Sequence, residues 1–457
     1  MKKILFLYGC MMVFAPLFSQ VEHNINLLGQ WEDSSLTTNL FGDVYNDVWG
    51  YARDGREYAI LGSTEGTHVL DVTDPENIVE VDMELGGYYG LRVVHRDYKV
   101  YNDYLYAVCD EGTSTLQIFD LRFLPDSVHK VYDSHKLIAR AHNIFIDTSS
   151  ARLYACAYST SGLSMNLYSI EKPWAPQPLP DFHRNWIHHV HDLYVRNDTA
   201  YLNCGQDGVH IVDFSNPNAP EVLSSMMAYE GLGYNHSGWL DPSGKTYVFT
   251  DETFGTEVKV CDVSNLDSFY IRASIPAGHS DTAIAHNAFI KGDFLYLSSY
   301  HDGLQIFDIS NPDNPVKTGW YDTYLPAAFR ELRGAWGVYP YLPSGNILVS
   351  DMSSGLLVFN VDKALNVREP GKAPIGAEVY PNPVTSTVDI SLKLAKSQDV
   401  SIKLFDTQGR LMEEKEEVGI GAGQSLSFDL TDYPSDVYFL VIETEHQVVT
   451  KKLIKLD

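Results

Sequence analysis

Short apolar runs separated by turn residues recur along most of the chain and predict β-strands rather than helices. In one well-formed stretch the runs occupy residues 287–291, 294–298, 304–308 and 316–320. Gly-Asp, His-Asp-Gly and Asn-Pro-Asp-Asn-Pro segments separate them. Because proline fixes φ and has no N–H group to donate, the last segment ends the third strand before an outer edge strand begins. The pattern predicts a unit of four antiparallel strands.

The same unit recurs along the chain. The segment Asp308-Ile-Ser-Asn-Pro312 repeats Asp213-Phe-Ser-Asn-Pro217, and weaker copies begin at Asp71, Asp120, Ser169, Asp262 and Asn360. Successive copies lie between 44 residues (Ser169 to Asp213) and 52 residues (Asp308 to Asn360) apart. This length suits a four-stranded propeller blade and exceeds that of common helical repeats. The repeats predict an all-β protein with a seven-bladed β-propeller over residues 21–365; six and eight blades are the alternatives.

The seventh copy lacks an outer strand, because the chain enters a Pro/Gly-rich stretch soon after Asn360. Residues 25–31, at the other end of the propeller, resemble the fourth strand at 316–320 and precede the first blade. We therefore expect the N-terminal strand to complete blade seven and to leave the ring without a free sheet edge.

A second, smaller domain follows the repeats. Residues 366–376 have the composition of a linker, and the remaining residues 377–457 contain another series of short apolar runs. These runs lie at 388–392, 400–405, 425–430, 437–442 and 448–455. Strands of this length in so short a segment predict a small Ig-like β-sandwich.

The N-terminus has the pattern of a secretory signal peptide. Lys2 and Lys3 precede an apolar run from Ile4 to Phe18, and residues 1–19 are expected to be removed on export. Too little apolar sequence precedes Cys10 for a lipoprotein signal. No later stretch is apolar enough to span a bilayer, so no transmembrane segment is expected in the mature chain.

The formal net charge of -27 excludes a nucleic-acid-binding role, because so acidic a protein repels phosphate backbones. It is compatible with a cationic ligand, with metal ions, or simply with a solvated acidic surface.

Histidines recur at the start of the innermost strand of successive blades. Trp49 and Trp336 occupy this position in blades one and seven, and histidines occupy it in blades two to six: His95, His142, His191, His236 and His286. Because innermost strands line the channel of a propeller, these side chains are expected to surround one mouth of that channel. Arg92 and Arg333 lie three residues before this position and would favour an anionic ligand, unless they pair with acidic groups.

A second set of polar residues follows at a spacing of fifteen, where the second strand should end. Antiparallel pairing predicts that Asp110 lies beside His95, Asp251 beside His236 and His301 beside His286. These six residues are the candidate ligands of a divalent metal such as zinc, manganese or calcium. Glu111 and Glu252 would act as bases if a metal were bound. The alternative is structural: such contacts would also hold blades together, as the equivalent histidines do in WD-repeat propellers.

No HExxH, CxxC, GxSxG or phosphate-loop motif accompanies the histidines, so no catalytic residue is assigned. We expect a non-catalytic propeller that binds a glycan, a peptide or an ion at the histidine-bearing face. A metal-dependent hydrolase that uses the same face is the alternative.

Two groups of motifs carry a family resemblance. Residues 208–217 and 303–312 resemble the LVIVD repeat of bacterial and archaeal surface proteins, which also occurs in the choice-of-anchor B family. Residues 379–383, 406–410 and 451–455 resemble the type A sorting domain of type IX secretion cargo, although Asp436 stands where that family usually has glycine. The resemblance implies recognition by the type IX machinery and a location outside the cell or on the outer-membrane surface of a Gram-negative bacterium.

Overall fold

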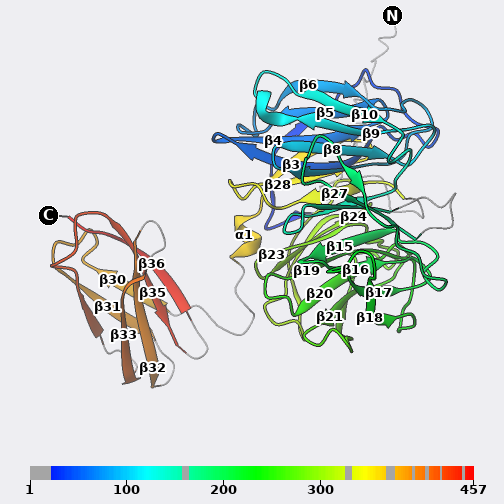
Figure 1. The fold of residues 1–457 in the computed structure, drawn as a ribbon. Helices are drawn as coiled ribbons and strands as arrows, with labels where there is room; N and C mark the ends of the chain where they lie inside the picture. The colour runs from blue at the N-terminus through cyan, green and yellow to red at the C-terminus, as the bar shows by residue number, and fades with distance from the viewer. Residues whose placement is uncertain are drawn as a thin grey trace, which may run out of the picture. The chain divides into compact units, whose positions relative to one another are not determined.

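The computed structural model describes residues 22–156, 164–324, 332–366, 376–393, 397–406, 411–421, 425–444 and 448–456. The chain divides into two compact units, residues 1–366 and 367–457 (Figure 1). The expected signal peptide and most of the expected linker lie outside the described residues.

The first unit is a seven-bladed propeller, which confirms the predicted fold class. Blade one consists of β3 (Tyr45–Arg53), β4 (Arg56–Ser63), β5 (Gly66–Asp71) and β6 (Val79–Leu85). Blade two consists of β7 (Arg96–Tyr101), β8 (Tyr104–Cys109), β9 (Leu116–Asp120) and β10 (His129–Ser134). Blade three consists of β11 (Ile144–Asp147), β12 (Arg152–Ala155), β13 (Asn166–Ser169) and β14 (Gln177–Pro178). A short 3-10 helix, η1 (Leu121–Phe123), follows β9.

Blades four to six continue the pattern. Blade four consists of β15 (Asp192–Arg196), β16 (Thr199–Asn203), β17 (Val209–Asp213) and β18 (Glu221–Met226). Blade five consists of β19 (Asn235–Leu240), β20 (Thr246–Asp251), β21 (Val258–Asp262) and β22 (Tyr270–Ile275). Blade six consists of β23 (Ala288–Lys291), β24 (Phe294–Ser299), β25 (Gly303–Asp308) and β26 (Val316–Tyr321). The four strands of blade six begin and end within two residues of the apolar runs that predict them.

Blade seven is built from both ends of the propeller. Its inner strands are β27 (Ala335–Tyr339), β28 (Ile347–Asp351) and β29 (Gly355–Asn360), and its outer strand is the N-terminal β2 (Asn26–Trp31). A still earlier strand, β1 (Glu22–His23), adds to the outer edge of blade six. The innermost strands β27 and β3 lie in contact, so the ring of blades is closed.

The direction of the strands determines where the chain leaves the propeller. Ala335 at the start of β27 pairs with Asp351 at the end of β28, and Asp351 pairs with Gly355 at the start of β29. β29 therefore begins on the face where the innermost strands start and ends on the other face, at Asn360. Asn26, the first residue of β2, pairs with Asn360 on that same face. The short helix α1 (Asp362–Leu365) follows.

The core of the propeller lies between neighbouring blades. A large aromatic side chain recurs in the second strands, where Tyr106, Tyr154, Tyr247 and Tyr296 are almost fully buried. Tyr106 also donates a hydrogen bond of 2.7 Å to the carbonyl oxygen of Pro173 in the next blade. A buried tyrosine thus packs two sheets together and satisfies its hydroxyl at their junction.

The second unit consists of two small antiparallel sheets. One contains β30 (Gly376–Tyr380), β31 (Thr387–Lys393) and β34 (Ser425–Asp429), and the other contains β32 (Gln398–Phe405), β33 (Leu411–Ile420), β35 (Val437–Glu443) and β36 (Val448–Ile454). Their shared core includes Val388, Ile402, Phe428 and Leu440. The sequence predicts five of these strands and misses β30 and β33. Part of the motif at 406–410 lies outside the described residues.

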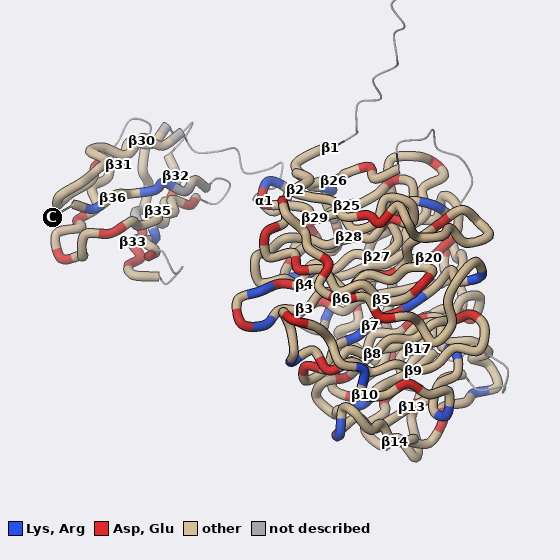
Figure 2. Tube along the Cα trace, turned by 90° about the horizontal axis from the view of Figure 1, so that it is seen from above, with Lys and Arg blue, Asp and Glu red and all other residues tan. Residues whose placement is uncertain are grey.

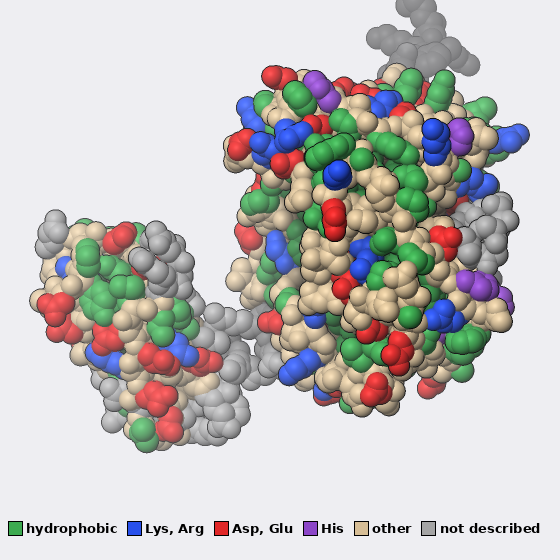
Figure 3. All heavy atoms as spheres, viewed as in Figure 1, with side chains coloured by type: hydrophobic (Ala, Val, Ile, Leu, Met, Phe, Trp, Pro, Cys, Tyr) green, Lys and Arg blue, Asp and Glu red, His purple; other side chains and the backbone are tan. Residues whose placement is uncertain are grey.

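Acidic and basic residues are distributed over both units (Figure 2). In a space-filling view, hydrophobic side chains also appear on the visible face of the propeller, interspersed with charged ones (Figure 3). Within the described ranges, no helix combines the length and the apolar character needed to cross a membrane.

Candidate functional site

Six aromatic side chains form a closed ring at one mouth of the channel, here called the histidine ring. Its members are His95, His142, His191, His236, His286 and Trp336, one from each of blades two to seven. Centroid distances between neighbouring rings are 4.0, 4.1, 4.2, 4.4 and 4.5 Å in that order, and 5.4 Å separates Trp336 from His95. The structure thus brings the five predicted histidines together.

Blade one departs from the prediction, because Trp49 does not occupy the ring position. A register shift in β3 follows Tyr45, as one follows Asn235 in β19 and Ala335 in β27. The residue of blade one that corresponds to His236 is therefore Asn46. Trp49 lies three residues further along the strand, where its ring contacts Tyr339 at a centroid distance of 5.0 Å.

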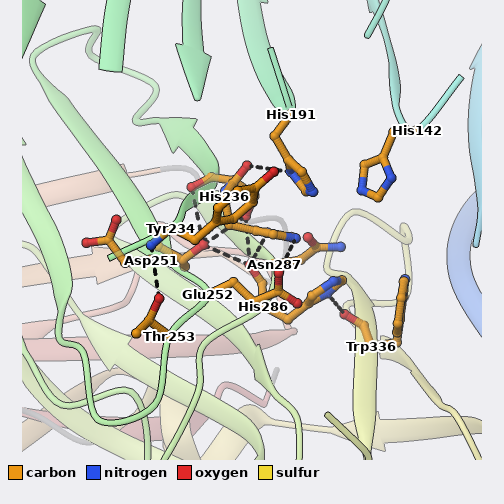
Figure 4. A network of polar contacts seen from close by, with 12 residues as sticks. His142, His191, Tyr234, His236, Asp251, Glu252, Thr253, His286, Asn287 and Trp336 are labelled. Carbon is orange, nitrogen blue, oxygen red and sulfur yellow. Dashed lines mark hydrogen bonds and ion pairs between the residues drawn. The ribbon is translucent and has the colours of Figure 1, made fainter. Parts of the chain in front are cut away.

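Hydrogen bonds to the next blade fix three of the imidazoles. The Nδ1 atoms of His191, His236 and His286 lie 3.2, 3.0 and 2.7 Å from the carbonyl oxygens of His236, His286 and Trp336 (Figure 4). A carbonyl oxygen only accepts hydrogen bonds, so each Nδ1 carries the proton. In the neutral imidazole the lone pair is then on Nε2, the nitrogen that is available to a metal ion.

Burial keeps most of these imidazoles neutral. It lowers the pKa of His95, His191 and His236 well below the usual value, and neighbouring histidines lower it further. Burial also lowers the pKa of His286, to about 3. His142 differs: burial opposes its protonation, but the Asp110 carboxylate, 2.9 Å from Nδ1, raises its pKa above the usual value.

Glu252 adds a carboxylate beside the ring. Its Oε2 atom lies 3.8 Å from Nε2 of His236, and its Oε1 atom accepts a hydrogen bond from the hydroxyl of Tyr300. Burial raises the pKa of Glu252, although the Tyr300 hydroxyl opposes that shift. The sequence indicates Glu252 only as a possible base, and not as a ligand.

Two groups within this site have the composition of a metal centre. His142, His191 and His236 form one, and His236, Glu252 and His286 form the other; within each group the ligand atoms lie within 4.8 Å of one another. Three histidines, or two histidines and one carboxylate, are the ligand sets of catalytic zinc sites. His236 belongs to both groups.

Among the described residues, the three predicted side-chain pairs, His95 with Asp110, His236 with Asp251 and His286 with His301, do not form. The Asp110 side chain binds His142 rather than His95, Asp251 accepts a hydrogen bond of 2.7 Å from the Tyr229 hydroxyl, and Nε2 of His301 lies 3.1 Å from Asp302. The reason is strand geometry, because successive side chains point to opposite faces. The residues next to Asp251 and His301 reach the ring instead: Glu252 lies beside His236, and Tyr300 beside His286.

The two predicted arginines have different surroundings. Arg92 is exposed and lines a surface groove. The Nε atom of Arg333 lies 3.9 Å from an Asp43 carboxylate oxygen, and its guanidinium group also donates to the carbonyl oxygen of Phe41. Arg333 is thus engaged with an acidic and a carbonyl group.

Further into the channel lies a cluster of acidic residues around one lysine. Asp97 contacts the Lys99 ammonium group at 2.7 Å. Burial and the neighbouring Asp97 charge raise the pKa of Asp47 well above its usual value, and burial raises the pKa of Asp192 to about 7. The cluster therefore limits its own charge by proton uptake and by one internal ion pair.

The comparisons with known proteins agree with this architecture. Residues 378–456 match the secretion system C-terminal sorting domain, and residues 188–228 and 284–323 match the LVIVD repeat. The crystal structure of RRP9 WD40 repeats is similar with a TM-score of 0.53 at 9% identity, over 74% of this chain and 99% of that chain. A putative 6-phosphogluconolactonase from Bacteroides uniformis aligns with a TM-score of 0.49 at 13% identity, over 84% of this chain and 100% of that chain. No curated protein matches the sequence.

The fold and the sorting domain define an exported β-propeller protein. The chain contains two LVIVD repeats within its propeller and carries a C-terminal sorting domain of the type IX secretion system. This domain directs the protein to the cell surface or the extracellular space of a Gram-negative bacterium, and the secretion machinery is its partner. The likeness to RRP9 concerns the fold alone.

Proposed function

We propose that this exported propeller is a non-catalytic binding protein that holds a divalent transition-metal ion at the histidine ring. The observation that carries the proposal is the position of the proton on Nδ1 in three of the ring histidines. Three imidazoles donate their Nδ1 protons to carbonyl oxygens of the next blade, which leaves each Nε2 lone pair available. Imidazoles held neutral by burial need not lose a proton before they bind a metal.

The donor set favours zinc over the other two metals that the sequence suggests. Both candidate groups contain at least two imidazole nitrogens, and one contains no oxygen donor. Calcium requires mainly oxygen ligands, and manganese also prefers them, whereas imidazole suits zinc. His142 is the most exposed ring histidine, with 20% of its side chain accessible, and provides the entry from solvent.

Titration of the purified, chelator-treated protein with zinc tests the proposal. We expect about one tightly bound ion per chain, because His236 is shared between the two groups and both cannot be filled independently. Replacement of His236 by asparagine should abolish this binding. Asn is chosen because its amide can still donate to the carbonyl oxygen of His286, so the contact between the blades is preserved.

His301→Asn is the matched control, since His301 is also buried but contacts Asp302 and Ser280 instead of the ring. This variant should bind zinc as the parent does. Zinc binding that survives His236→Asn, or a parent protein that takes up no zinc, would refute the proposed site.

Metal-dependent hydrolysis is a second candidate, supported by one observation. With the ion held by His142, His191 and His236, Glu252 would not be a ligand but would lie beside His236, where its carboxylate would accept a proton from a metal-bound water. Glu252→Gln would then retain zinc and lose hydrolytic activity toward ester and lactone substrates. If the zinc-loaded parent hydrolyses none of them, the binding role remains and the enzymatic one fails.

A further inference from the structure

A cavity of about 530 Å³ adjoins the histidine ring. Its lining includes Trp336 from the ring and Glu252 from one candidate metal group. The rest of its wall is formed by Phe41, Asp43, Val94, Tyr300, Leu332, Arg333 and Met352. This volume lies within the range of small-molecule sites. A ligand in this cavity would lie next to the proposed metal ion.

The wall of the cavity is mainly apolar and deepens toward the ring. Tyr300, Trp336 and Met352 are buried, with exposed fractions of 0%, 7% and 3%, and they pack in one cluster with Val94. Phe41 and Leu332 are 63% and 45% exposed and form the rim. Sugars and extended polar peptides would leave their hydroxyl or amide groups unpaired on such a wall. A flat apolar molecule suits it better.

Phe41 also connects the cavity to the outer surface. It lines a second hollow of about 320 Å³ together with Leu40, Tyr88, Leu91 and Arg92. Two of the segments that line this hollow are joined, because the backbone N–H of Leu40 donates a 2.9 Å hydrogen bond to the carbonyl oxygen of Leu91. Leu40 and Leu91 are exposed and, with Phe41, form the apolar part of this hollow, whose lining also includes the charged residues Arg92, Glu111 and Arg140.

The charges at the inner end of the cavity indicate the charge that the ligand should carry at that end. The guanidinium group of Arg333 is already engaged with Asp43 and with the carbonyl oxygen of Phe41. A divalent ion held by His236, Glu252 and His286 would combine two positive charges with one carboxylate, and the local net charge would be +1. Such a centre favours a monoanionic oxygen ligand.

We propose that this cavity binds a small aromatic monocarboxylate, with its ring against Trp336 and Met352 and its carboxylate on the metal ion. The inference rests on the proposed function, since it requires the ion at the group of His236, Glu252 and His286. It goes further by specifying the ligand class. It also places the apolar part of the ligand in the cavity beside the histidine ring, where no sequence motif indicates a site.

Calorimetric titration of the zinc-loaded protein with 2-naphthoate tests this inference. Acetate provides the carboxylate without the ring, and 2-naphthylmethanol provides the ring without the charge. We expect 2-naphthoate to bind at least about tenfold more tightly than either, because only it uses both the cavity and the ion. Removal of zinc should weaken 2-naphthoate binding by a similar factor.

Val94→Trp fills the cavity and should lower the affinity for 2-naphthoate at least about tenfold while zinc uptake stays unchanged. Leu232→Trp is the matched control, because Leu232 is also partly exposed in the loop before an innermost strand but does not line the cavity. Thermal unfolding of both variants shows whether they fold.

The outcomes separate the two proposals. Zinc uptake without 2-naphthoate binding, or 2-naphthoate binding that Val94→Trp leaves unchanged, overturns the cavity inference and keeps the metal site. Absence of zinc uptake overturns the proposed function, and the ligand class inferred from the ion fails with it.

Discussion

The Nδ1 atom of His236 donates a hydrogen bond to the carbonyl oxygen of His286 in the next blade, over 3.0 Å. The sequence leaves two explanations for the histidines, a structural bond between blades and a ligand site. This bond shows that one imidazole can serve both roles, because Nδ1 joins the blades and Nε2 remains available. The two roles are therefore separable by substitution.

Replacement of His236 by alanine should remove both roles, whereas replacement by asparagine should remove only the ligand. We expect His236→Ala to lower the free energy of unfolding of the metal-free protein by about 1–3 kcal/mol, the usual cost of a lost buried hydrogen bond. The free energy of unfolding of His236→Asn should lie closer to that of the parent. Chemical denaturation with a chelator present measures the difference, and equal stability of the two variants would show that the bond between blades contributes little.

The acidic cluster in the channel predicts a pH dependence. The pKa of Asp47 is raised by burial and by the charge of Asp97, so the folded protein holds a proton that the unfolded chain loses near pH 4. This contribution to stability is present below the unfolded pKa and is lost as the pH rises through the folded one. Asp47→Asn, which mimics the protonated form, should therefore gain stability over the parent as the pH rises from 4 to 8.

The other charged groups around Asp47, namely Asp97, Lys99 and Asp192, are common to both proteins. Chemical denaturation of both proteins at four pH values measures this. A difference in the free energy of unfolding between them that stays constant with pH would contradict the prediction.

Removal of the N-terminal strand should open the ring. Deletion of residues 21–32 removes β2 from blade seven and exposes the edge of β29, which is hydrophobic and buried at Leu356, Val358 and Phe359. We expect the melting temperature to fall by more than about 4 °C, the change that corresponds to a loss of well over 1 kcal/mol in a domain of this size. Deletion of residues 21–23 alone, which removes only β1 from the outside of blade six, should have a much smaller effect. Similar melting temperatures for the parent and the longer deletion would argue against closure by β2.

Removal of the second unit should prevent export without unfolding the propeller. The two units have separate cores, so a chain that ends at residue 376 retains all propeller strands. Without the sorting domain, we expect this chain to accumulate inside the outer membrane. Cell fractionation with an antibody against the propeller measures its location, and thermal unfolding confirms that the truncated chain is folded. Surface exposure of the truncated chain would contradict the role of the sorting domain.

The repeat allowed much of the propeller to be predicted, because each blade repeats the same alternation of apolar runs and turn residues. The sequence does not indicate β33 for a physical reason: its central residues, from Glu413 to Glu417, are charged and lack the apolar alternation of a half-buried strand. The five histidines were placed correctly in space because they repeat at one position of the unit.

Side-chain direction was harder to predict than position. A shift of a single residue separates Asp251, which binds Tyr229, from Glu252, which reaches the ring. Register shifts at the same place in β3, β19 and β27 align Asn46, rather than Trp49, with His236 and Trp336. Spacing alone does not reveal such irregularities, since they depend on the local pairing of the strands. The cavity depends on loops from distant blades and had no signal in the sequence.

The course of β29 has a consequence for how the protein is presented to its surroundings. This strand starts beside Asp351 on the face that bears the histidines and ends at Asn360 on the other face, where β2 also begins. The C-terminal end of the propeller therefore emerges on the side away from the ring, whereas the first described strand, β1, begins beside Tyr321 on the ring side. A tether that continues from the C-terminal end would leave the propeller on the face opposite the histidines, so the attachment point itself would not cover the mouth that bears them.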